Sequence, residues 1–117
     1  MAEAWPSELR LHDNGTKLTI QFDDASVYDL PAEYLRVESP SAEVQGHSPS
    51  ERKTVGGKKN VRIVEIAPVG NYAVRLDFDD GHNTGIFSWG YLAELGRDHD
   101  RKWAAYLEAL KATGQAR

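Results

Sequence analysis

The residues best suited to chemistry lie in two short, polar segments of the chain. An irregular loop and the turn of a later hairpin together hold the following candidates: Ser39, Ser41, Glu43, Gln45, His47, Asp80 and His82. Imidazole and carboxylate groups can bind a metal ion, or act as a base with its orienting partner. The spacing matches neither a His-Glu-x-x-His motif nor an EF-hand loop, and one serine near a histidine does not make a catalytic triad. A binding role and a purely structural role, in which these side chains hydrogen bond within the loop, therefore both stay open.

A second cluster of candidates is basic and surrounds a Gly-Gly pair. Its members are Arg52, Lys53, Lys58, Lys59 and Arg62. Such a cluster can attract phosphate, nucleic acid or an acidic partner. It is not a Walker A motif, because the earlier glycine is missing and Lys58 is followed by a second lysine. We expect mainly solvent-exposed side chains beside a turn, and phosphate or nucleic-acid binding stays as an alternative.

The composition is that of a folded domain and excludes several classes of protein. With 117 residues, 40% hydrophobic and 27% charged, the chain suits one domain with a real core and is not a disordered polyelectrolyte. It has no cysteine, so it forms no disulfide, thiolate zinc site or cysteine nucleophile. A net charge of −4 argues against a surface that binds nucleic acid generally. Neither a signal peptide nor a membrane-spanning run is present, so we expect a cytoplasmic protein without membrane contact.

The elements that must position the candidate residues follow from hydrophobic periodicity. Alternation at 9–11 and at 18–22, on either side of Asp-Asn-Gly at 13–15, predicts a β-hairpin. A third short strand is expected at 26–30, and the proline that follows it begins a short helix over 31–36. The first half of the chain is therefore expected to be a small meander that ends in a helical turn.

The second half repeats this order of elements. Strands are expected at 61–66 and 74–78, separated by a turn at 68–71, and a third strand at 84–87 follows an Asp-Gly turn. Ser88 is a predicted N-cap of a helix that Gly96 ends. A last helix carries an apolar stripe at helical spacing, formed by Trp103, Tyr106, Leu107 and Leu110.

Together these elements predict an α+β fold. We expect one domain over residues 1–117, with a core of about 7–112, built as a twisted, mainly antiparallel sheet with short helices and a C-terminal helix packed on it. Between the two halves, residues 38–60 show no periodicity and predict a long irregular loop of the kind that often carries recognition. If the two units pack together, this loop comes near the turn at 80–83.

Three runs of residues carry a resemblance to a known family. They are the run from Tyr34 to His47, the run from Pro68 to Val74, and the run from Phe78 to Trp89 that contains Phe-Asp-Asp-Gly-His and Gly-Ile-Phe-Ser-Trp. In these the chain resembles the gamma-butyrobetaine hydroxylase-like N-terminal domain family, over about Leu9 to Leu95. The resemblance implies a small α+β domain that occurs alone in bacteria, before 2-oxoglutarate-dependent oxygenases, or attached to iron–sulfur carrier ATPases. It implies no hydroxylase activity for this chain, because the oxygenase's iron and 2-oxoglutarate residues belong to a following domain.

The resemblance also bears on metal binding. In the oxygenase branch of the family, a Cys-x-Cys-x-x-Cys run and one distant histidine hold structural zinc. Laid on this chain, those positions are Ser39, Ser41 and Val44, with His82 in the place of the histidine. Three of the four ligands are therefore replaced, and neither serine nor valine substitutes for a thiolate.

From the residues and the resemblance together, we predict a non-enzymatic accessory or interaction module. The predicted binding surface comprises Arg36, Ser39, Ser41, Glu43, Gln45, His47, Asp80 and His82. The expected partner is a protein, and the resemblance implies an iron–sulfur carrier ATPase or a metalloenzyme. No cofactor is expected. The alternative is a metal-binding protein that holds zinc or iron through His82, His47, Glu43 or Asp80.

Overall fold

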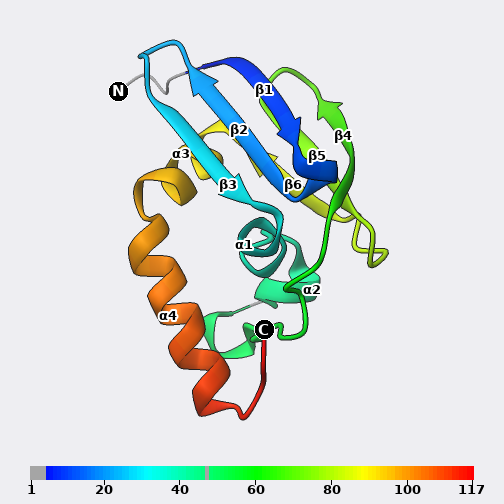
Figure 1. Ribbon diagram of the computed structural model, residues 1–117, viewed down its shortest axis with the longest axis vertical. Helices are drawn as coiled ribbons and strands as arrows, with labels where there is room; N and C mark the ends of the chain where they lie inside the picture. Colours follow the sequence, from blue (N-terminus) through cyan, green and yellow to red (C-terminus); the bar gives the residue numbers. More distant parts are fainter. Residues whose placement is uncertain (1–4, 47) are drawn as a thin grey trace.

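The computed structural model describes residues 5–46 and 48–117 and contains two similar halves (Figure 1). The elements of the first half are β1 (Pro6–His12), the 3₁₀ turn η1 (Asp13–Gly15), β2 (Lys17–Phe22), β3 (Val27–Pro31) and α1 (Ala32–Val37). The connection holds α2 (Ala42–Gln45) and the 3₁₀ turn η2 (Pro49–Glu51). The second half comprises β4 (Ile63–Val69), β5 (Ala73–Phe78), β6 (Gly85–Ser88), α3 (Trp89–Arg97) and α4 (His99–Ala112). The predicted α+β class is confirmed.

The first three strands form one antiparallel meander. β2 lies between β1 and β3 and pairs with both, with Leu18 opposite Leu11 on one side and Leu30 on the other. The predicted Asp-Asn-Gly turn is present, and all three of its residues have positive φ. A Cβ at Gly15 would lie 2.2 Å from the carbonyl oxygen of Ile63, so only glycine lets this turn approach β4.

The last three strands form a second antiparallel meander in the order β4-β5-β6. β4 begins and ends later than predicted, and Pro68 pairs with Val74 inside it, so the turn shifts to the residues after Val69. Proline is tolerated there because β4 is an edge strand and no ladder bond needs the missing N–H. The strands of the described chain thus pair in two sheets, where one sheet was expected.

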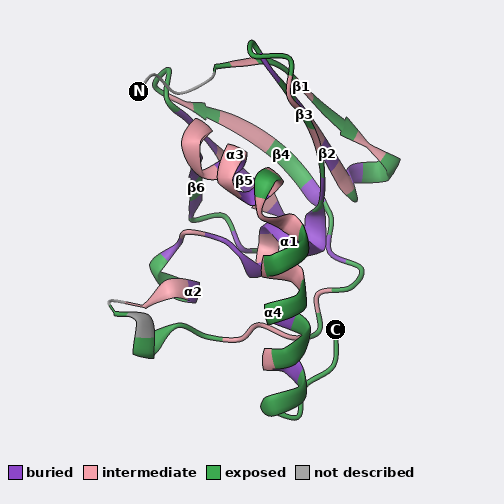
Figure 2. Cartoon of the chain, turned by 90° about the vertical axis from the view of Figure 1, so that its left-hand side faces the viewer, coloured by how far each residue is buried: buried purple, intermediate pink, exposed green. Residues whose placement is uncertain are grey.

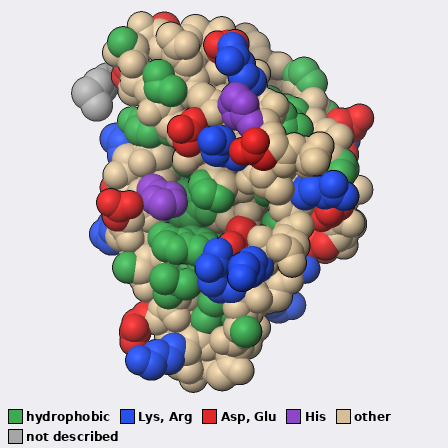
Figure 3. All heavy atoms as spheres, in the orientation of Figure 1, with side chains coloured by type: hydrophobic (Ala, Val, Ile, Leu, Met, Phe, Trp, Pro, Cys, Tyr) green, Lys and Arg blue, Asp and Glu red, His purple; other side chains and the backbone are tan. Residues whose placement is uncertain are grey.

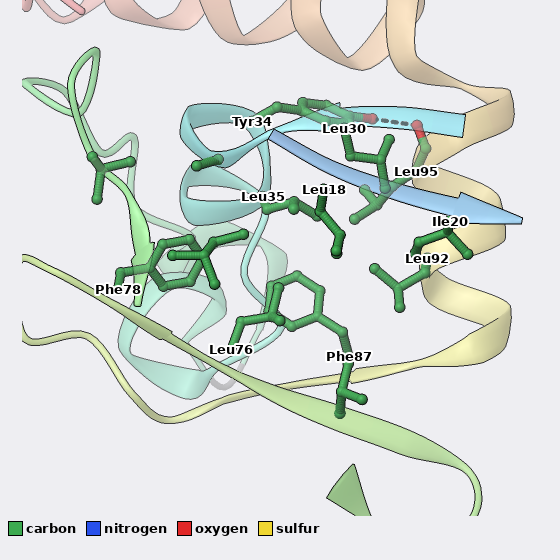
Figure 4. Close-up of a cluster of buried hydrophobic side chains, with 14 of the residues drawn as sticks. Leu18, Ile20, Leu30, Tyr34, Leu35, Leu76, Phe78, Phe87, Leu92 and Leu95 are labelled. Atoms are coloured by element: carbon green, nitrogen blue, oxygen red, sulfur yellow. Dashed lines mark hydrogen bonds between the residues drawn. The ribbon is translucent and has the colours of Figure 1, made fainter. Parts of the chain in front are cut away.

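One hydrophobic core joins the two halves (Figure 4). Side chains of β2, β5 and β6, among them Ile20, Leu76 and Phe87, meet the buried side of α1 and α3 with no exposed surface. Tyr34 of α1 lies in the same cluster, and its hydroxyl donates to the carbonyl of Leu95 at 2.7 Å. This bond ties the helix of the first half to the helix of the second.

The C-terminal helix packs through a narrower stripe than the sequence predicts. Tyr106 and Leu110 are buried against Val37 of α1, and Trp103 packs partly buried beside them. Leu107 was expected in this stripe but is 40% exposed, because it projects to one side of the contact. Figure 3 shows hydrophobic side chains gathered where α4 lies beside α1, with Lys and Arg side chains next to them. None of the helices in the described ranges has the length and apolar character that a membrane crossing requires.

The long connection between the halves is more ordered than its lack of periodicity suggests. Ser41 caps α2, since its Oγ accepts a hydrogen bond from the Glu43 N–H at 3.2 Å. A helix of four residues is too short to produce a visible hydrophobic period, so the sequence pattern missed it. The connection then returns past α4 before β4 begins (Figure 2).

Candidate functional site

The loop after α1 and the turn after β5 meet at one buried hydrogen bond. Ser39 Oγ lies 2.9 Å from His82 Nε2, although the two residues are 43 positions apart in the chain. Ser39 is fully buried and His82 is 7% exposed. Ser39 Oγ accepts the Ser41 N–H at 3.3 Å, which leaves its own hydroxyl hydrogen for Nε2. The other ring nitrogen, Nδ1, lies 3.5 Å from Oε2 of the Glu43 carboxylate.

The approach of these segments depends on a glycine that the sequence reasoning did not single out. A Cβ at Gly85, the first residue of β6, would lie 2.5 Å from Ser39 Oγ and 3.0 Å from the ring of Phe87. Both contacts are closer than side chains tolerate. Gly85 therefore lets β6 lie directly against the loop.

A second set of hydrogen bonds joins α2 to the same turn. Ser41 Oγ lies 2.7 Å from Thr84 Oγ1, and the Thr84 hydroxyl also donates to the Glu43 carboxylate. This hydrogen bond lowers the pKa of Glu43, and the positive potential of a protonated His82 adds to the shift. Glu43 is thus an ionised side chain with 63% of its area exposed. Thr84 also escaped the sequence reasoning, because a lone threonine before a strand gives no local signal.

Asp80 lies beneath this set between two cations. Its Oδ2 is 2.9 Å from Arg36 Nε and 2.6 Å from Lys58 Nζ, and its Oδ1 accepts the His82 N–H at 3.1 Å. Burial raises the pKa of Asp80, but the bonds from Lys58, the His82 N–H and Arg36 outweigh burial and lower it to about 2. Arg36 Nη1 is buried and has no hydrogen-bond partner among the described residues. The ion pair fixes the turn that carries His82.

Gln45 supports the loop from the other side. Its Nε2 donates to the Ser39 carbonyl at 2.8 Å, and its Oε1 accepts a bond from Arg52 at 3.3 Å. Arg52 in turn pairs with the buried Glu38 carboxylate at 3.0 Å. Seven of the eight predicted surface residues are therefore brought together, and we call them the polar surface: Arg36, Ser39, Ser41, Glu43, Gln45, Asp80 and His82. The eighth, His47, lies outside the described residues.

The donors present do not suit the structural zinc site that the resemblance implies for one branch of the family. Ser39 and Ser41 offer neutral hydroxyls at the positions of thiolates, and Val44, which is buried, offers no donor at all. Among the described residues, His, Asp and Glu nowhere form a group of three or more able to hold a metal ion. The Asp80 carboxylate, one of the alternative ligands, is instead bound by two cations.

The contacts from Ser39 to His82 and from His82 to Glu43 follow the order of a nucleophile, a base and an orienting carboxylate. A nucleophile must reach its substrate, however, and the Ser39 side chain has no exposed surface. Burial, and then the nearby Arg36 cation, lower the pKa of His82, which favours the neutral ring. In this conformation the three groups brace the loop.

The basic cluster is divided over two hollows of the surface. Arg52 and Lys53 line one, and Lys58 and Lys59 line the other together with the carboxylates of Asp79 and Asp80. Three of its five cations are paired with acidic groups: Arg52 with Glu38, Lys58 with Asp80, and Arg62 with Asp79. Ion pairs therefore balance most of the positive charge of the cluster.

The comparisons with known proteins agree with the resemblance seen in the sequence. The family model described as gamma-butyrobetaine hydroxylase-like, N-terminal, matches residues 9–93. Two proteins whose structures were solved by NMR in solution are similar. The first has 47% sequence identity and a TM-score of 0.84, and the match covers 99% of this chain and 91% of that protein. The second has 45% identity and a TM-score of 0.83, and the match covers 97% of this chain and 85% of that protein.

A crystal structure from Acidithiobacillus ferrooxidans ATCC 23270 is similar as well. It is described as a protein with unknown function that belongs to the DUF971 family, and has 42% identity and a TM-score of 0.64 over 78% of this chain and 91% of its own. The search among curated proteins found no match. Since the family model covers well over half of the chain, this protein belongs to the gamma-butyrobetaine hydroxylase-like N-terminal domain family.

Proposed function

We propose that this domain is a non-enzymatic accessory module that binds a protein partner through the polar surface. The observation that carries the proposal is the convergence of the loop after α1 on the turn after β5, where hydrogen bonds and an ion pair join the two segments. Buried polar groups that are paired favour one geometry, and among the described residues of this network only Arg36 Nη1 is buried without a hydrogen-bond partner. The polar surface is therefore ordered before a partner arrives.

The division of labour within the polar surface supports binding as well as bracing. Ser39 and His82 are buried and hold the two segments together. Glu43 is ionised and largely exposed, so its carboxylate is available to a partner. A preordered surface loses little conformational entropy on association, which leaves more of the contact energy for affinity.

The class of partner is supported by the family. The family resemblance implies a domain that is attached to iron–sulfur carrier ATPases or precedes oxygenases, so a protein that handles iron–sulfur clusters or metals is the partner we propose. The chain itself supplies no thiolate, and accordingly the role proposed is to bind the partner and not to carry its metal.

The test is capture of the partner from the native host by the full chain and two single variants. Glu43→Ala removes the exposed carboxylate of the polar surface, and Glu65→Ala is its matched control, because the two side chains are 63% and 62% exposed. Glu65 lies on β4 and also faces a cation, Arg75. We expect Glu43→Ala to weaken capture about tenfold, as the loss of a charged contact does, and Glu65→Ala to leave it unchanged.

Two results would count against the proposal. The first is a Glu43→Ala variant that loses folding stability but captures the partner as well as the unchanged chain does. That result would mean that the polar surface only braces the loop. The second is turnover of a defined small molecule by the purified chain without a partner, which would make the protein an enzyme.

A further inference from the structure

A groove next to the polar surface has the chemistry of a peptide-binding site. It measures about 410 Å³ and lies between α4 and the extended segment 52–55, which follows η2. This size is within the range of pockets that hold organic ligands. Figure 2 shows the chain after α2 turning back and running beside α4. Sequence reasoning missed the groove because its two walls are far apart in the chain.

The floor of the groove is apolar and fixed in place. Val37 of α1, Val55 of the extended segment and Tyr106 of α4 form it, with Ala105 and Ala109 beside them. The Tyr106 hydroxyl donates to the Val55 carbonyl at 2.7 Å, which locks the segment to the helix. The floor can therefore take one apolar side chain without rearrangement.

The rim of the groove is positive although the protein is acidic. Four lining residues are cations, namely Arg52, Lys53, Arg101 and Lys102, and one, Glu38, is a carboxylate. Glu38 is nearly buried and paired with Arg52. Asp98 and Glu94 pair with Arg101 and Lys102, so three of the four cations are balanced by carboxylates. The excess of one positive charge is carried by Lys53, which has no ion pair among the described residues.

The extended segment also offers backbone groups. Its Thr54 carbonyl accepts a bond from Gln115 at 3.1 Å, and the Lys53 N–H donates to the Val44 carbonyl at 2.8 Å. The N–H groups of Thr54 and Val55 have no hydrogen-bond partner within the part of the chain that the structure describes. An extended peptide can use such groups when it lies along a segment of this kind.

We infer that this groove binds an extended acidic peptide of a partner protein, with one apolar side chain on the floor and carboxylates on either side of it. The inference rests on the proposed function, since it names the chemistry of the partner. A peptide is favoured over nucleic acid because the floor is apolar and the positive charge is confined to the rim, whereas nucleic acid needs a continuous basic track.

The experiment is a selection of random displayed peptides on the immobilised full chain, followed by NMR mapping of the strongest binder. The inference predicts enriched peptides that carry several Asp or Glu residues around one aliphatic or aromatic residue. It predicts amide shifts at Lys53, Val55 and Tyr106 when such a peptide is added, and affinity that falls as salt rises.

Three variants test the contacts. The double change Lys53→Glu with Arg101→Glu should weaken the selected peptide at least about tenfold, because both rim charges reverse. Ala105→Trp should weaken it to a similar degree, because a large side chain beside the apolar floor obstructs the groove without a change of charge. Arg10→Glu is the control, since Arg10 and Arg101 are both exposed and each pairs with one nearby carboxylate.

The inference is overturned if no peptide is enriched, if the enriched peptides show no acidic preference, or if the shifts map away from the groove. Tighter binding of a single-stranded oligonucleotide at the same residues would also overturn it. Native partner capture separates this inference from the proposed function. If Glu43→Ala weakens capture of the native partner and the groove variants do not, the polar surface stays the docking site and the inference about the groove is wrong.

Discussion

At the scale of single residues, His82 joins the two segments of the polar surface. The ring lies between Ser39 Oγ at Nε2 and Glu43 at Nδ1, with the Arg36 and Asp80 side chains on its other flank. The family resemblance indicated that the segments of Ser39 and His82 meet. It could not indicate Thr84 or Lys58, because their contacts arise only when the chain has folded.

The first prediction concerns pH. Burial lowers the folded-state pKa of His82, so protonation favours the unfolded chain, in which histidine titrates near pH ~6.5. The contribution of His82 to stability is therefore full above pH ~6.5 and is lost as pH falls from there towards the folded-state pKa. Urea unfolding between about pH 7 and about pH 5 should show a decline in wild type that is smaller in His82→Gln.

The carboxylates near His82 do not titrate in the pH range in which His82 loses its contribution to stability. The neighbouring carboxylates Glu43 and Asp80 have lowered pKa values and so titrate at more acidic pH. His12→Gln serves as the control, because His12 lies in β1 and contacts Thr19 instead. A decline of the same size in His82→Gln as in wild type would contradict the assigned burial of the ring.

The second prediction concerns the metal. A zinc ion bound by a thiolate and an imidazole holds S and N about 3.6 Å apart. Ser39 Oγ and His82 Nε2 lie 2.9 Å apart, so the two side chains already face one another and need to separate only slightly to admit an ion. The triple variant S39C/S41C/V44C should therefore bind cobalt(II) with one equivalent and show intense thiolate charge-transfer absorption. The unchanged chain should bind cobalt(II) or zinc only weakly, since its hydroxyls and valine are poor donors.

The companion variant S39C/S41C/V44C/H82A controls for adventitious binding by the thiols. Tight, stoichiometric zinc binding by the unchanged chain would contradict the metal-free description of the polar surface. Failure of the folded triple variant to bind cobalt(II) would contradict the expectation that positions 39, 41 and 44 can meet His82 around one ion.

At the scale of elements, local signals predicted much and long-range pairing little. The hairpins followed from alternation and from Asp-Asn-Gly and Asp-Gly turns, which act over a few residues. The existence of two sheets, the short helix α2 and the exposure of Leu107 depend on packing between distant segments. The β4 strand ends later than predicted, because Pro68 was expected in a turn but pairs with Val74 at the edge of the sheet.

The third prediction tests the packing of α4. The Trp103 ring meets the Tyr34 ring edge-on, with the two ring centroids 6.2 Å apart. The Arg117 guanidinium lies over the Trp103 ring, 5.4 Å from the centroid of that ring. Trp103→Ala should cost about 2 kcal/mol in chemical unfolding, somewhat less than a fully buried tryptophan, because the side chain is partly exposed. Leu107→Ala, on the exposed side of the same helix, should cost less than about 0.5 kcal/mol. Equal costs in the two variants would contradict the described face of α4.

At the scale of the whole molecule, two similar units, each a meander followed by a helix, share one hydrophobic core. The polar surface lies where the loop after α1 of the first unit meets the turn after β5 of the second. The faint repeat in the sequence, strand, acidic turn, strand and short helix, is present in both units. The position of the polar surface at their junction followed from the family resemblance. The groove beside it did not, because its cations come from the segment near Lys53 and from α4, and no sequence pattern joins them.

The most direct test of the central claim is amide chemical-shift mapping of the labelled full chain with its captured native partner. The account predicts the largest shifts at residues 39–45 and 80–84, with the exposed Glu43 among the most affected, and small shifts on the outer face of β4 to β6. Shifts confined to that outer face, with residues 39–45 and 80–84 unchanged, would contradict the claim that the polar surface binds the partner.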